Sequence, residues 1–102
     1  MQYMCVHTFP PNGMTRQQVE QFSQATQRSD EVRGIQSYVN LTEGKAVCVL
    51  EASSKGILEN FFKKMGMPYD SVTPVELQGA NGIIHAAKQT TSRTDQAQWP
   101  PT

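Results

Sequence analysis

The sequence predicts a small α+β domain with the element order β-α-β-β-α-β, and three observations support it. Two segments carry apolar residues at helical spacing, and β-branched segments flank each of them. Residues 42–45 are too few for anything except a hairpin turn between two of those strands. The chain has 102 residues with 37% hydrophobic residues, which fits one core and leaves no room for two domains.

The first strand and first helix follow from local signals. Residues Gln2–Thr8 include β-branched and aromatic side chains and no breaker, which is typical of a strand. Residues 9–13, Phe-Pro-Pro-Asn-Gly, form a loop. Thr15 and Gln18 have the spacing of a capping box, so we expect a helix over residues 16–28.

The middle of the chain predicts two strands, residues 35–41 and 46–51. The second of these, Ala-Val-Cys-Val-Leu-Glu, is apolar on both faces, which indicates a central position in the sheet.

The second helix and the last strand complete the pattern. Ser53 or Ser54 caps the helix, and Gly66 ends it. Residues 72–77 form the fourth strand, in which Pro74 indicates an edge or a bulge.

This order is the split βαβ pattern of a ferredoxin-like fold, an antiparallel four-stranded sheet with two helices on one face. Its other face lies bare, so we expect a homodimer of the dimeric α/β-barrel kind. We assign residues 1–78 to this domain and residues 79–102 to a C-terminal extension, with a short strand at 83–87. We expect this extension to reach across to the partner chain, with Trp99 or Ile83 and Ile84 packing there. The competing arrangement is an extension that covers the bare face of its own chain.

Charge excludes several classes of function. Nine Lys and Arg residues balance nine Asp and Glu residues, so the chain has no cationic excess for nucleic acid or anionic membranes. The first residues do not resemble a secretory signal, no apolar run is long enough to span a membrane, and two cysteines are too few for a disulfide scaffold. We therefore expect a cytoplasmic protein.

Four residues are candidates for a metal site. Cys5 and His7 are two residues apart on one strand, so their side chains share a face. The third strand, beside it, carries Cys48 and Glu51, which are three residues apart and face opposite sides unless a bulge intervenes. Imidazole and thiolate are ligands for nickel and other transition metals. The alternative is that His7 bonds a backbone group and both cysteines are core residues.

Several stretches resemble a bacterial family of small ferredoxin-like domains of unknown function that has a nickel-binding member. The matching motifs are His-Thr-Phe-Pro at 7–10, Gly-Met-Thr at 13–15, Gly-Lys at 44–45 and Gly-Met-Pro-Tyr-Asp at 66–70. The resemblance covers residues 2–78 and implies a dimeric α/β domain, with His7 as the position to compare with the nickel site. Cys5 stands where that relative has an acidic residue.

Two other functions stay open. His7 would serve as the general base of an enzyme similar to cofactor-free α/β-barrel monooxygenases, which requires an apolar pocket beside it. Alternatively, the chain is an interaction domain without a site. The sequence favours a non-catalytic protein and implies no cofactor other than nickel or another transition metal.

Overall fold

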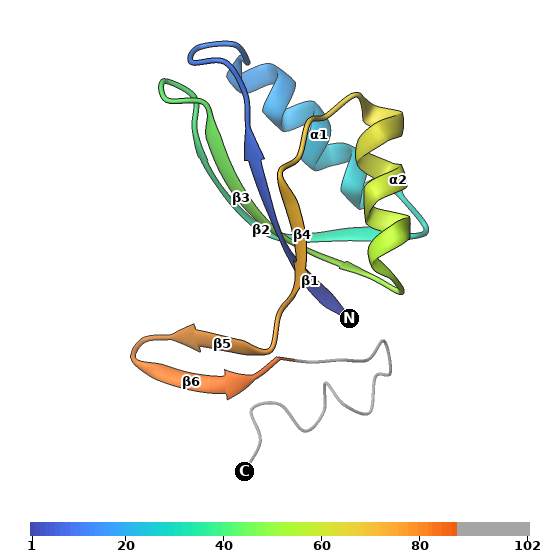
Figure 1. Cartoon of the computed structure of the whole chain (residues 1–102), viewed down its shortest axis with the longest axis vertical. Helices are drawn as coiled ribbons and strands as arrows, with labels where there is room; N and C mark the ends of the chain where they lie inside the picture. The colour runs from blue at the N-terminus through green and yellow to red at the C-terminus, as the bar shows by residue number, and fades with distance from the viewer. Residues whose placement is uncertain (88–102) are drawn as a thin grey trace.

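The computed structural model describes residues 1–87 and shows an α+β fold (Figure 1). The elements in chain order are β1 (Gln2–Thr8), α1 (Arg16–Arg28), β2 (Val32–Asn40), β3 (Lys45–Ala52), α2 (Lys55–Met65), β4 (Ser71–Pro74), β5 (Leu77–Ala80) and β6 (Ile83–Ala86).

A four-stranded antiparallel sheet forms the centre of the molecule. Its strand order is β2-β3-β1-β4, so β3 lies inside the sheet and β4 at an edge, as the sequence predicts. Both helices lie on the same side of this sheet (Figure 1). No helix within residues 1–87 is long and apolar enough to cross a membrane.

The alternation of β1 separates the two faces of the sheet. Tyr3, Cys5 and His7 are buried on the helix-covered side, whereas Met4 and Val6 are exposed on the open side. The core continues from this side with residues of the other strands and of α2, namely Val32, Leu50, Ala52, Leu58, Phe62 and Val72.

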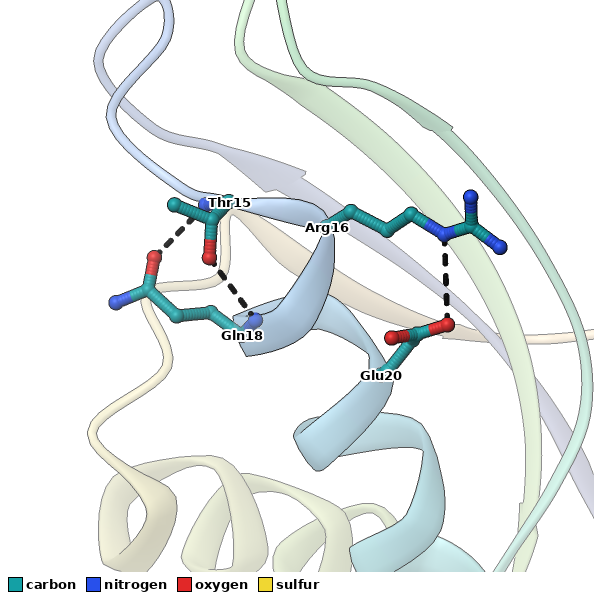
Figure 2. A network of polar contacts seen from close by, with 4 residues as sticks. All are labelled: Thr15, Arg16, Gln18 and Glu20. Atoms are coloured by element: carbon teal, nitrogen blue, oxygen red, sulfur yellow. Dashed lines mark hydrogen bonds and ion pairs between the residues drawn. The ribbon is translucent and has the colours of Figure 1, made fainter.

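The N-terminus of α1 has the predicted capping box (Figure 2). The Thr15 hydroxyl accepts a hydrogen bond from the Gln18 backbone N–H at 3.1 Å, and the Thr15 N–H donates to Gln18 Oε1 at 2.8 Å. These two bonds satisfy two backbone N–H groups at the helix end, which fixes the start of the helix. Arg16, the first residue of the helix, also forms an exposed ion pair with Glu20 at 3.4 Å.

The ends of α2 also follow the sequence signals. Ser54, rather than Ser53, is the N-cap, and its hydroxyl accepts a hydrogen bond from the Ile57 N–H. Gly66 closes the helix in the left-handed conformation, with φ of 69°.

The second strand begins three residues earlier than predicted. Val32 and Arg33 already pair with β3, and a bulge between Gly34 and Gln36 interrupts the register. A Cβ at Gly34 would lie 2.5 Å from Thr26 Oγ1, so the glycine allows the last turn of α1 to approach the strand. The expectation that this strand begins at Ile35 was wrong, because Gly34 lies within the strand and pairs with Leu50.

The fourth strand is shorter than predicted and ends at Pro74. After the bond from the Val75 N–H to the Gln2 carbonyl, β1 offers no further partner, because it begins at Gln2. The chain then forms an antiparallel hairpin of β5 and β6, which lies apart from the main sheet (Figure 1). The expected contact of Trp99 lies outside the described residues.

Candidate functional site

His7 is the central residue of the candidate site. Its side chain is 1% exposed although it lies near the end of β1. Nδ1 lies 2.9 Å from the Pro68 carbonyl oxygen, and the ring packs edge-on against Phe62 at 5.0 Å between centroids. Nε2 is buried without a hydrogen-bond partner, the one such side-chain nitrogen or oxygen within residues 1–87.

The loop after α2 holds this ring in place through three hydrogen bonds to β1. Besides the His7 bond, the Asp70 N–H donates to the Val6 carbonyl at 2.7 Å, and the Thr8 hydroxyl donates to Asp70 Oδ2 at 2.5 Å. Two of the motifs that carry the family resemblance, residues 7–10 and 66–70, therefore meet in space.

The hydrogen bonds define the protonation state of His7. A carbonyl oxygen only accepts, so Nδ1 carries the proton that it donates to Pro68. Burial lowers the pKa of the imidazole, against the opposing effects of the Pro68 carbonyl and the Asp70 carboxylate. The neutral ring therefore presents a lone pair at Nε2, as a metal ligand, a general base or a hydrogen-bond acceptor requires.

Cys5 and Cys48 lie directly opposite each other on neighbouring strands, on the same sheet face as His7. Both are free thiols. Burial, with a further contribution from Cys48, raises the pKa of Cys5 to about 12. Burial also raises the pKa of Cys48, against a hydrogen bond with Ser37. Both side chains are therefore protonated thiols at neutral pH.

Glu51 does not join these residues. It pairs with Gln2 in the sheet, on the opposite face from Cys48, and its carboxylate lies 4.0 Å from the Arg33 guanidinium. The register of β1 and β3 is regular, so no bulge changes the parity. In the part of the chain that the structure describes, no three His, Cys, Asp or Glu side chains form a group that could hold a metal ion.

A cavity of about 430 Å³ lies between the two helices and the sheet, and His7 and Cys48 line it, whereas Cys5 does not. Its walls are mostly apolar and include Phe9, Met14, Val19, Phe22, Val39 and Phe61. The base-catalysis hypothesis requires such an apolar space beside His7. The helical spacing of Val19 and Phe22 puts them on one face of α1, but no sequence signal distinguishes the wall of a cavity from a filled core.

The half-buried side chains of α1 show why the space exists. Thr26 is the only buried residue of this helix, and Val19, Phe22 and Ala25 are only partly covered. The helix therefore touches the sheet at its C-terminal turn and stands away from it elsewhere.

Comparisons with known proteins agree with this fold. The crystal structure of SCO4226 from Streptomyces coelicolor A3(2) superposes with a TM-score of 0.66 at 23% identity, over 78% of this chain and all of that one. No curated protein matches the sequence. Residues 3–75 match the model of a family described as nickel responsive protein SCO4226-like. This match spans well over half of the chain and includes both motifs that meet at His7. The chain therefore belongs to the SCO4226-like family of nickel responsive proteins.

Proposed function

We propose that this protein binds a transition metal through His7 Nε2, and that nickel is the metal it binds. The observation that supports the proposal most is the buried Nε2 without a partner. An isolated buried acceptor is costly unless something bonds to it, and the family's description names nickel.

The surroundings of the ring suit a ligand role. In metal sites, a ligating histidine usually donates its other N–H to a carbonyl or carboxylate, which fixes the tautomer and orients the ring. The bond from His7 Nδ1 to Pro68 has this form. Cys48 is the second donor we propose because it lines the same cavity, and thiolate suits nickel as imidazole does.

Cys5 would support these two ligands without binding the metal itself. It is fully buried in the core and faces Cys48 across the strand pair, so it would adjust the position and charge of that thiol. Metal binding must displace protons from thiols of raised pKa, so nickel uptake would release protons and strengthen with pH.

Calorimetry with NiCl₂ tests the proposal on the full chain. We expect saturable binding by the wild type, loss of binding in His7→Asn and weaker binding in Cys48→Ala. Asparagine retains a donor near the position of Nδ1 but has no counterpart to Nε2. The matched control is His85→Asn, which changes the histidine of β6 and should leave nickel binding intact. A wild-type Kd weaker than about 0.1 mM, or full binding by His7→Asn, would refute it.

The fold and assembly belong to the same proposal. The order β2-β3-β1-β4 with both helices on one side supports a ferredoxin-like description. We propose that two copies pair through the open sheet face, in the manner of a dimeric α/β barrel, in the cytoplasm, where Cys5 and Cys48 stay reduced. The exposed apolar side chains of the β5–β6 hairpin, Leu77, Ile83 and Ile84, would add to that interface.

A further inference from the structure

The cavity is far larger than a metal ion requires. Its volume of about 430 Å³ is in the range of pockets that bind small organic molecules. It is walled by residues of both helices and of the sheet, and it is partly open to solvent.

The charges of the cavity indicate what kind of molecule fits. Among its lining residues there is no Lys or Arg, and the carboxylate present, Glu20, is exposed and paired with Arg16. An anionic ligand would find no cation and would lose its hydration. The ligand that suits these walls is uncharged and mostly apolar.

The polar groups of the cavity narrow the class further. The Thr26 hydroxyl donates to the Ser23 carbonyl, and the Gln27 amide donates to the Gly34 carbonyl, so these donors are already used. His7 Nε2 is different, since its lone pair has no partner and its ring lines the cavity. Nδ1 is already bonded to the Pro68 carbonyl, so Nε2 is the ring nitrogen that is left for a ligand.

We infer that this cavity binds an uncharged, mostly apolar organic molecule with one O–H or N–H group, which donates a hydrogen bond to His7 Nε2. This inference goes beyond nickel binding and does not depend on it, because the apolar walls and the unpartnered nitrogen are present without a metal. Phenols and indoles are the simplest members of the class.

The test compares two probes of nearly the same shape. The metal-free full chain, kept in EDTA, is titrated by calorimetry with 1-naphthol and with 1-methoxynaphthalene, which cannot donate a hydrogen bond. We expect both to bind, with 1-naphthol about tenfold tighter. In His7→Asn the difference should disappear, while the methoxy compound binds as before. Absence of saturable 1-naphthol binding, or a preference that survives in His7→Asn, would overturn the inference.

A second pair of variants checks the location. Val19→Trp should fill the cavity from α1 and abolish binding of both probes, whereas Gln17→Trp, on the exposed side of the same helix, should not. If Val19→Trp does not fold, the ¹⁵N resonance of His7 Nε2 in the wild type decides. It should shift when 1-naphthol is added and stay unchanged if the probe binds elsewhere.

The two proposals fail separately. Nickel binding without 1-naphthol binding would overturn the inference alone, and 1-naphthol binding without nickel binding would overturn the proposed function alone. If both hold, nickel should compete with 1-naphthol, because both use Nε2.

Discussion

A buried histidine with one satisfied nitrogen and one free nitrogen defines this molecule at the scale of single residues. The bond to Pro68 orients the ring, which packs against Phe62 and is almost fully buried. His7 is therefore a neutral base in an apolar setting, and its protonation destabilises the folded state. This loss of stability can be measured.

We predict that His7 makes stability fall as the solution is acidified. Burial lowers its pKa in the folded state from the ordinary value of 6.5, so the unfolded chain binds more protons. The stabilisation is complete above pH 6.5 and is lost as the pH falls through 6.5 towards the lower folded pKa. Urea unfolding should show a wild-type slope of up to about 1.4 kcal/mol per pH unit in this window.

The variants His7→Asn and His85→Asn separate this effect from other titrations. The first should flatten the slope in the same window, and the second should retain it. An unchanged slope in His7→Asn would mean that another group is responsible.

Residue identity predicted part of the site and no more. Spacing two apart placed Cys5 and His7 on one face, and the structure agrees. Whether Cys48 or Glu51 joins them depended on the register of β1 and β3, which no local pattern encodes. The alternative that His7 bonds a backbone group agrees with the bond to Pro68, but no pattern identified which carbonyl would be the partner.

At the scale of elements, the caps and turns were the predictable features. The Thr15 and Gln18 box and the glycine that ends α2 carry their own chemistry, so their places were visible in the sequence. The extent of β2 and β4 was not, because strand ends depend on where the neighbouring strand stops. The β5–β6 hairpin shows this, since only its second strand was predicted.

Two glycines with positive φ should differ sharply when replaced. Gly66 has φ of 69° and nothing within 4 Å of an added Cβ, so Gly66→Ala should cost about 1 kcal/mol of unfolding free energy. Gly44 has φ of 78°, and its Cβ would lie 2.0 Å from the Phe9 carbonyl oxygen. Because that oxygen belongs to the backbone, the loop beside the cavity must move.

Gly44→Ala should therefore cost more than about 3 kcal/mol or prevent folding. Thermal and urea unfolding of both variants check this, with Gly66→Ala as the matched control for backbone strain alone. Equal losses in the two variants would contradict the close approach.

At the scale of the whole molecule, the open face of the four-stranded sheet is an exposed apolar surface. Met4, Val6, Tyr38 and Val47 lie together on it, and Val47 is 44% exposed in a single chain. A strand surface of this kind promotes association unless something covers it. Because β3 is apolar on both faces, the sequence predicted that both faces need to be buried. It did not determine whether another chain or the C-terminal extension covers the face opposite the helices.

We predict a homodimer through this face. Light scattering at micromolar concentration should give about 23 kDa, twice the chain mass of 11.4 kDa. Val47→Glu should shift the protein towards the monomer, because a carboxylate would be buried without a partner. Gln21→Glu adds the same charge to the exposed side of α1 and should leave the mass unchanged. A wild-type mass near 11.4 kDa would refute the dimer.

The hydrogen bonds that hold the His7 ring also have a consequence for the order of folding. They join the end of β1 to a loop 61 and 62 residues later in the chain. Closing a loop of this length has an entropic cost, which the packing of the intervening elements lowers. We therefore expect the orientation of His7 to be acquired late in folding. A molecule that binds Nε2 more tightly in this orientation than in the unfolded chain shifts, by mass action, the folding equilibrium of the whole domain towards the native state.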